Sequence, residues 1–177
     1  MELIPFPGSE SPSLRLEARA KWNGRLLDLE FSLSHPQLVA SLTNLPVSDE
    51  RRDELWKTTC FECFLTTEKM KPAYYEINLS PGGDWAFYGF TSYRQGMKKS
   101  DLSAAPLKTS SQEKATWSYR LDLSDQNSLK NETLLVSLCA VIESREGAVS
   151  YWSLVHRQSK PDFHHLEHFV HVLSPKE

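Results

Sequence analysis

The residues of this chain that could do chemistry are concentrated in two neighbouring segments. Residues 55–64 read LWKTTCFECF, and residues 74–85 read YYEINLSPGGDW. Both are rich in aromatic, carboxyl and amide side chains. A ligand with many hydroxyl groups needs this mixture, because its hydroxyls require hydrogen-bond partners while its C–H faces pack on flat rings. The two segments therefore indicate a polyol-binding site.

The alternation of side chains along extended backbone predicts how these groups meet. If 60–66 and 74–80 pair as an antiparallel hairpin, Glu62 faces Asn78 on the adjacent strand, and Glu76 lies diagonally from Glu62. The opposite faces of both strands are apolar and belong against the core. The polar face is interpreted as a binding surface, with the ordinary wet face of an antiparallel sheet as the alternative.

The same pair of carboxyl groups leaves an enzymatic function open. Diagonal neighbours on paired strands are separated by roughly 7–8 Å, and the carboxyl pairs of glycosidases fall in a similar range. Glu62 and Glu76 could instead form ion pairs with Arg94 or Arg120. The chain contains no Ser-His-Asp order, phosphate loop or H-E-x-x-H motif. Binding without catalysis is therefore favoured.

Cysteine and histidine patterns raise the question of a metal. Cys60 and Cys63 form a C-x-x-C, but residues three apart on a strand point to opposite faces, so we predict two structural thiols. Adjacent His164 and His165 cannot both point at one ion on a regular strand. Residues 160–164 are better explained as a structured loop at the binding end. No metal site is predicted, and metal binding by the His-rich segment 164–171 stays an open alternative.

The elements that must position these groups are strands. Period-two alternation on both sides of Asn23-Gly24 predicts a β-hairpin with a type I′ turn over residues 14–33. Residues 38–42 are a possible short strand, and residues 95–115 are polar and predicted to be a long loop. Further strands are expected at 59–66, 74–80, 85–93, 116–123, 133–143 and 149–156.

This number of short strands, with frequent turn residues between them, predicts an all-β fold, a sandwich of two antiparallel sheets. Residues 1–13 contain three prolines, one glycine and three serines, and are predicted to be an irregular N-terminal arm. Residues 14–177 are predicted to be one ligand-binding domain. The apolar run at 134–142 is expected to be a central strand, with a buried helix as the alternative.

Three motifs resemble a known family. They are L-W-K-x-T-C-F-E-x-F, then Y-Y-E-x-N-L-S-P-G-G-D-W-x-x-Y-x-F-x-x-Y-R, and finally Y-W-x-L-x-H with K-P-D-F-H. They are similar to motifs of the bacterial DOMON-like domains, which are related to type 9 carbohydrate-binding modules. The resemblance covers roughly residues 10 to 173 and implies an immunoglobulin-like sandwich that binds either sugar or haem.

The resemblance also implies a site. In the sugar-binding relatives two tryptophans sandwich a terminal sugar and a nearby Glu binds its hydroxyls. Trp56 and Glu62 match the first Trp and the Glu in order and context, and Trp152 matches the second Trp by position. Arg94 and His156 are further candidates at that end of the fold. In the haem-binding relatives a Met and a His ligate the iron, for which Met97 and His156 are the available pair.

Composition limits the partners. The chain has 177 residues, 40% of them hydrophobic and 24% charged, and a net charge of −3. This mild charge gives no reason to expect nucleic acid or an anionic membrane surface as a partner. No basic leader is visible, and the odd number of cysteines mildly favours a reducing compartment, so a cytoplasmic location is expected. The expected ligand is a small saccharide or other polar molecule, with no cofactor; the sequence does not define the oligomeric state.

Overall fold

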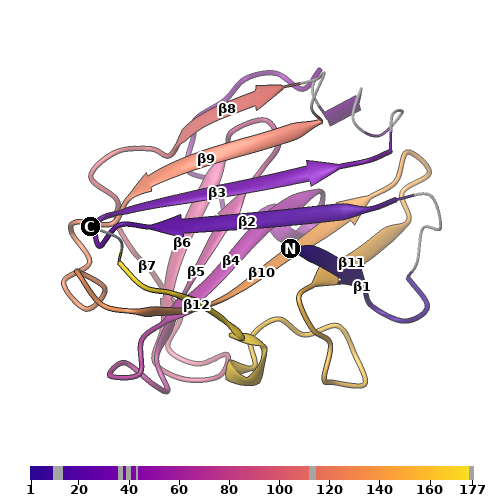
Figure 1. The fold of residues 1–177 in the computed structure, drawn as a ribbon. Coiled ribbons are helices and arrows are strands. Elements are labelled where there is room, and N and C mark those ends of the chain that lie inside the picture. Colours follow the sequence, from indigo (N-terminus) through magenta and orange to yellow (C-terminus); the bar gives the residue numbers. More distant parts are fainter. Residues whose placement is uncertain (10–13, 36–37, 39–40, 43, 112–114, 176–177) are drawn as a thin grey trace.

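β-Strands make up the framework of the chain (Figure 1). The computed structural model describes residues 1–9, 14–35, 38, 41–42, 44–111 and 115–175. The strands are β1 (Glu2–Pro5), β2 (Leu16–Trp22), β3 (Leu26–Leu33), β4 (Cys60–Thr66), β5 (Tyr74–Leu79), β6 (Trp85–Phe90), β7 (Lys98–Lys99), β8 (Leu107–Ser111), β9 (Thr116–Asp122), β10 (Leu134–Glu143), β11 (Val149–Ser153) and β12 (His171–Leu173). Two 3-10 helices accompany them, η1 (Leu55–Lys57) and η2 (Leu166–His168). The all-β prediction is confirmed.

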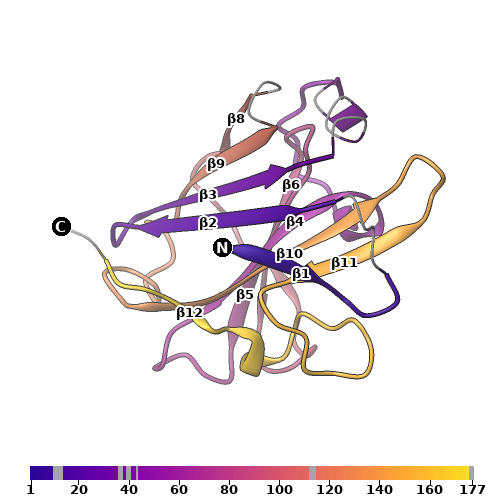
Figure 2. The same cartoon turned by 45° about the vertical axis from the view of Figure 1, so that its right-hand side comes forward.

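The strands form one large, curled antiparallel sheet. Their order is β7-β6-β5-β4-β10-β11-β1-β2-β3-β9-β8, and β12 pairs with β10. The short strand β1 makes the path continuous, since it pairs with β11 through Ile4 and with β2 through Leu3. Figures 1 and 2 show β2, β3, β9 and β8 in one layer that crosses the layer of β4, β5, β6 and β10. The structure therefore contains a single curled sheet with two crossing layers, where the sequence predicted a sandwich of two separate sheets.

The core lies between these layers. Alternating residues of β3 and β9 meet the inward residues of β4, so that Phe31 stacks on Phe61 with ring centroids 4.7 Å apart. Trp117 packs on the same Phe61 ring at 5.6 Å. The central-strand prediction for 134–142 is confirmed, because β10 pairs with β4, β11 and β12.

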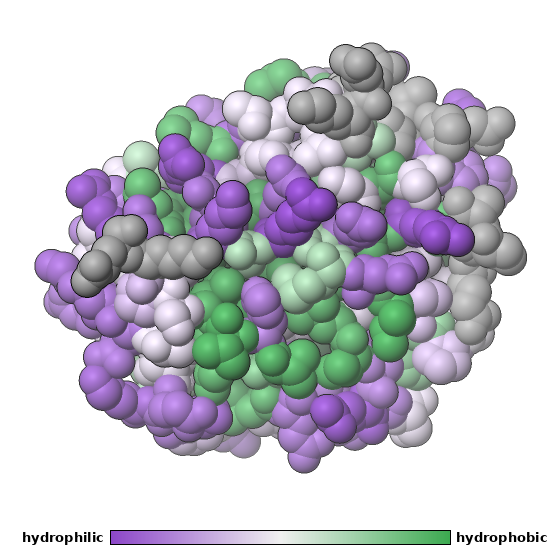
Figure 3. Space-filling model, in the orientation of Figure 1, coloured by the Kyte–Doolittle hydropathy of each residue, from purple (hydrophilic) through white to green (hydrophobic). Residues whose placement is uncertain are grey.

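Outside the core, the surface differs between the layers. Figure 3 shows hydrophilic residues over β2 and β3 and a more hydrophobic area beside β1 and β12. In that area Ile4 and Val172 are about half exposed. Within the described part of the chain, the helical segments are too short or too polar to cross a membrane.

Several short elements differ from the sequence-based prediction. The arm at 1–13 contains β1, and the predicted loop at 95–115 contains β7 and β8. These strands lack an alternating apolar pattern, so only their pairing with neighbouring strands defines them. Of the possible strand at 38–42, residues 38, 41 and 42 are helical, and residues 39–40 lie outside the described residues.

The predicted hairpin at Asn23-Gly24 is confirmed, but its turn begins one residue later. Trp22 pairs with Leu27, and the Asn23 N–H donates to the carbonyl of Leu26, which leaves Gly24 and Arg25 as the loop residues. Gly24 has φ +90°, whereas Arg25 is not among the residues with positive φ. A positive φ at the first loop position alone defines a type II′ turn instead of type I′.

Replacing Gly24 with Ala is expected to lower the free energy of unfolding by more than about 1 kcal/mol. A Cβ there would strain the positive φ and would clash with Oδ1 of Asn131. The matched control is Gly147→Ala, since Gly147 has φ +82° with nothing within 4 Å. Urea denaturation should show the larger loss for Gly24→Ala, and equal losses would mean that the Asn131 side chain moves away without cost.

Candidate functional site

A cavity of about 340 Å³ lies on the face of β4 and β5 that points away from the core. It is lined by Trp56, Glu62, Phe64, Glu76, Phe90, Arg94, Met97, Val141, Tyr151, Pro161, Asp162, Phe163 and His164. Alternation along β4 explains this placement. Phe61 and Cys63 belong to the core cluster, so Glu62 and Phe64 face the other way.

The predicted register of the two site strands is confirmed. Glu62 pairs with Asn78 across β4 and β5, and Glu76 pairs with Phe64, which places the two carboxyl groups diagonally. The prediction for the cysteines is also confirmed in its geometry. The Cys60 thiol donates to the Asn78 side-chain oxygen at 3.7 Å, on the cavity side, whereas Cys63 lies in the core.

Glu62 is the most unusual group in the cavity. Its side chain is buried, and its Oε1 has no hydrogen-bond partner among the described residues. Burial, and secondly repulsion from Glu76, raises the pKa of Glu62 well above its ordinary value. A buried carboxyl oxygen without a partner is energetically costly, so this oxygen is ready to bind a hydrogen-bond donor from a ligand.

Glu76 is also buried but is partly satisfied. Its Oε1 accepts a hydrogen bond of 2.7 Å from the Asn78 amide. Burial raises the pKa of Glu76 to about 7, although the bond from Asn78 and the positive charge of Arg94 act in the opposite direction. Glu62 and Glu76 together therefore hold protons at pH values where isolated carboxyl groups are ionised.

A chain of hydrogen bonds holds the other side of the cavity. The backbone N–H of Arg94 donates to the Tyr74 hydroxyl at 3.1 Å, and this hydroxyl lies 2.9 Å from Nδ1 of His164. Nε2 of His164 lies 4.0 Å from Oε2 of Glu76. Burial, followed by the charge of Arg94, lowers the pKa of His164 to about 4. The imidazole is therefore neutral at pH 7, and it is placed between Tyr74 and Glu76.

Arg94 and Asp162 form an ion pair at the cavity. The Arg94 guanidinium donates to Oδ1 of Asp162 at 3.1 Å, and the same oxygen accepts the backbone N–H of His164. Burial raises the pKa of Asp162, but the hydrogen bond from the Tyr93 hydroxyl, followed by the bonds from His164 and Arg94, outweighs this effect and holds the pKa below its ordinary range. The pair fixes the 162–164 segment, and the charge of Arg94 is largely neutralised by its partner.

The cavity walls are aromatic. Trp56, in η1, packs edge-on against Tyr88 with ring centroids 6.1 Å apart. Phe64, Phe90, Tyr151 and Phe163 also line the space. Phe64, Phe90 and Phe163 are buried, whereas Trp56 and Tyr151 are partly exposed. Together with the carboxyl groups, these rings form the combination that small-molecule sites use, namely apolar contact surface with a few directional polar groups.

Four of the seven site residues predicted from the sequence line this cavity, namely Trp56, Glu62, Glu76 and Arg94. Asn78 lies beside it and holds Glu76. Trp152 and His156 are not among the lining residues. Trp152 is buried in the core, and its indole N–H donates to Ser150.

The strand geometry of β11 explains why Trp152 lies in the core and does not line the cavity as predicted. Successive side chains alternate between faces, so when Trp152 packs into the core, its neighbour Tyr151 faces the cavity. Sequence reasoning missed Tyr151 as well as Asp162, Phe163 and His164. The segment K-P-D-F-H was nevertheless placed at the binding end, and this motif is the signal for the last three.

The pair considered for haem does not fit this cavity. Met97 lines it and is 48% exposed. His156 is directed elsewhere, since its Nε2 donates to the Ile4 carbonyl at 3.0 Å and its ring packs against Phe6. Within the described residues, His, Cys, Asp and Glu side chains nowhere form a group of three that could hold a metal ion.

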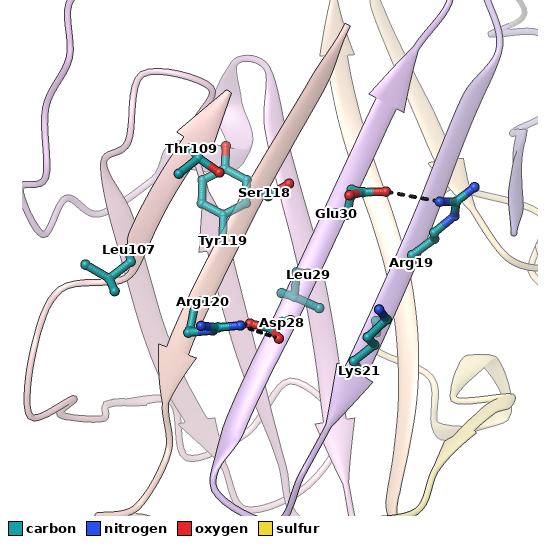
Figure 4. Close-up of a pocket in the computed structure, with 11 residues that line it drawn as sticks. Arg19, Lys21, Asp28, Leu29, Glu30, Leu107, Thr109, Ser118, Tyr119 and Arg120 are labelled. Carbon is teal, nitrogen blue, oxygen red and sulfur yellow. Dashed lines mark hydrogen bonds and ion pairs between the residues drawn. The ribbon is translucent and has the colours of Figure 1, made fainter. Parts of the chain in front are cut away.

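A second hollow, of about 490 Å³, lies on the outer face of β2, β3, β9 and β8 (Figure 4). Four of its charged side chains form two ion pairs, Arg19 with Glu30 and Arg120 with Asp28. The members of these pairs are well exposed. This pattern is typical of the solvated face of an antiparallel sheet. The cavity at Glu62 is therefore the stronger candidate site.

Comparison with known proteins supports the fold. No family model and no curated protein matches the sequence. A solved structure from Bacteroides uniformis ATCC 8492, named as a putative carbohydrate-binding protein, is similar with a TM-score of 0.66 and 15% identity, over 98% of this chain and 85% of that chain. At this identity the likeness shows that the two chains share a fold.

Two further structures are more distant. They are a family 9 carbohydrate-binding module from Caldicellulosiruptor kristjanssonii with glucose and a module of that family from the same organism with cellotriose. Each has a TM-score of 0.46. Identities are 13% and 12%, over 90% of this chain and 76% and 74% of the modules.

Proposed function

We propose that this chain is a non-catalytic binding domain that holds a small saccharide in the cavity at Glu62. The observation that carries the proposal is the unpartnered, buried Oε1 of Glu62 at the floor of an aromatic-walled cavity. The cavity volume of about 340 Å³ lies near the lower end of the usual range for small-ligand sites, about 300–1,000 Å³. This size suits one or two sugar rings better than a long polysaccharide.

The chemistry of the lining matches a sugar. Trp56 and Tyr151 offer rings for the C–H faces of a pyranose, and Glu62 offers an oxygen to its hydroxyls. The fold shared with the Bacteroides uniformis protein is consistent with this proposal. We further propose that the chain is a DOMON-like domain related to type 9 carbohydrate-binding modules, its two crossing layers corresponding to their immunoglobulin-like sandwich.

One observation favours glycoside hydrolysis as a second candidate. Glu62 and Glu76 lie diagonally on paired strands in the cavity, and burial raises the pKa of both. A carboxyl group that stays protonated near neutral pH can act as a general acid. Incubation with disaccharides and detection of released monosaccharide separates this activity from binding alone.

The test of saccharide binding is calorimetric titration of the protein with a panel of mono- and disaccharides, followed by Trp56→Ala with the best ligand. The variant is expected to bind at least about tenfold more weakly, which corresponds to about 1.4 kcal/mol. The loss is expected because Trp56 provides stacking surface.

Two further variants make this result interpretable. Trp56→Phe keeps an aromatic ring and should retain part of the affinity even if Trp56→Ala unfolds. Leu107→Ala, at a side chain that is 70% exposed on β8, should bind like the wild type. If no saccharide binds at millimolar concentration, the proposed function is rejected. If Trp56→Ala binds with unchanged affinity, Trp56 does not contact the ligand.

A further inference from the structure

The charges of the cavity at Glu62 are unbalanced. Glu62 and Glu76 are both buried, and they contribute two carboxyl groups from adjacent strands. Arg94 is the one lysine or arginine among the described lining residues, and its guanidinium is bonded to Asp162. His164 contributes no charge at neutral pH. The cavity therefore contains two buried carboxyl groups and, among its described lining residues, no cationic side chain that is free to pair with them.

The unpartnered Oε1 of Glu62 indicates which kind of ligand group the cavity would bind. Asn78 occupies one oxygen of Glu76, while Cys60 and Cys139, the other polar neighbours of Glu62 on β4 and β10, are buried thiols. Burial favours the protonated form of Glu62, and a neutral hydroxyl that donates to Oε1 brings no charge that would stabilise the ionised form. A protonated amine donates the same hydrogen bond, and its positive charge also stabilises the ionised carboxylate, so that the two form a charge-assisted pair.

The walls favour the same chemistry. Trp56, Phe64, Phe90, Tyr151 and Phe163 all line the cavity. The face of an aromatic ring carries partial negative charge and attracts a cation, most strongly where water is excluded. An ammonium group between these rings and Glu62 therefore has favourable contacts on several sides. An anionic ligand would meet the two carboxyl groups with no free cation to offset them.

We infer that the preferred ligand of this cavity is an amino saccharide, whose protonated amine binds at Oε1 of Glu62 while its ring packs on the aromatic walls. This inference rests on the proposed saccharide-binding function and specifies its substrate class. It predicts an order of affinity in which amino sugars bind most tightly, neutral sugars less tightly, and uronic acids most weakly.

The test is titration at pH 7 with four probes that differ in charge, namely glucosamine, glucose, N-acetylglucosamine and glucuronic acid, with galactosamine and galactose as a second pair. Each amino sugar is expected to bind at least about tenfold more tightly than its neutral parent, and N-acetylation should abolish this preference because it removes the charge. In Glu62→Gln, which keeps the size and one acceptor oxygen, the preference should fall to about parity.

The control is Glu30→Gln on the outer face of β3, where the carboxyl pairs with Arg19 outside the cavity (Figure 4). It should retain the preference of the wild type. Glucose bound as tightly as glucosamine would overturn this inference but leave the saccharide-binding proposal intact. A preference that persists in Glu62→Gln would overturn the assignment to Glu62, and failure of all probes to bind would overturn both proposals.

Discussion

Replacing Phe61 with Ala is expected to lower the free energy of unfolding by about 3–5 kcal/mol. Phe61 is fully buried in β4, and its ring stacks on Phe31 of β3 and packs on Trp117 and Tyr119 of β9. Truncation would leave a cavity between the two crossing layers, where close-packed neighbours relax only partly. The loss is measured from guanidinium unfolding curves at equilibrium.

Phe61→Leu and Leu107→Ala are the comparison variants. The first keeps most of the apolar volume and should lose less stability, and the second changes an exposed side chain and should stay within about 0.5 kcal/mol of the wild type. A loss of less than about 1 kcal/mol for Phe61→Ala would be far below the usual range for a buried Phe. It would mean that the packing of Phe61 between the two layers contributes little to stability.

Strands could be predicted from the sequence where their apolar and polar side chains follow a recognisable pattern. Residues 16–33 alternate between apolar and polar side chains on both sides of the turn, whereas in residues 60–66 Glu62 is the one charged residue of a largely apolar run. The hairpin, the strand at 60–66 and the Glu62–Asn78 pairing were predicted correctly. The short strands β1, β8 and β12 have no such pattern. β8 forms a hairpin with the next strand, β9. β1 pairs with β11 and β12 pairs with β10, strands distant in the sequence, so the formation of these two depends on tertiary pairing that local propensity does not encode.

The same rule explains which of the predicted residues line the cavity and which do not. Alternation from the core residue Phe61 placed Glu62 on the cavity side. Trp152 was selected by its position in a motif, but a shift of one residue reverses the face of a strand, and Tyr151 occupies the cavity instead. Phe163 and His164 lie on an irregular segment, where no period predicts the direction of a side chain.

Replacing Glu76 with Gln is expected to change how stability depends on pH. Burial raises the pKa of Glu76 to about 7, whereas an unfolded Glu titrates near about 4.3. The folded state therefore holds more protons between these values. The stabilising contribution of the protonated carboxyl is fully present below about pH 4.3 and is lost as the pH rises through about 7. At about 1.4 kcal/mol per pH unit, the total loss by pH 8 approaches about 4 kcal/mol, and it is shared with Glu62 because the two groups titrate together.

Gln cannot ionise but can still accept the hydrogen bond from Asn78, so Glu76→Gln should avoid much of this loss. Buried His164 acts in the opposite direction, since its pKa is lowered to about 4 and its contribution is lost as the pH falls from about 6.5 through that value. The informative quantity is therefore the difference between the variant and the wild type, in which the contribution of His164 largely cancels.

Urea unfolding of both proteins at pH 5, 6, 7 and 8 measures this difference. The variant should gain stability relative to the wild type as the pH rises, by up to about 3 kcal/mol between pH 5 and 8. For the control Glu68→Gln, at a carboxyl that is 74% exposed, the free energy of unfolding should depend on pH in the same way as for the wild type. Parallel profiles for Glu76→Gln as well would mean that the Glu62–Glu76 pair is solvated in solution, and the unpaired buried acid on which the site depends would be absent.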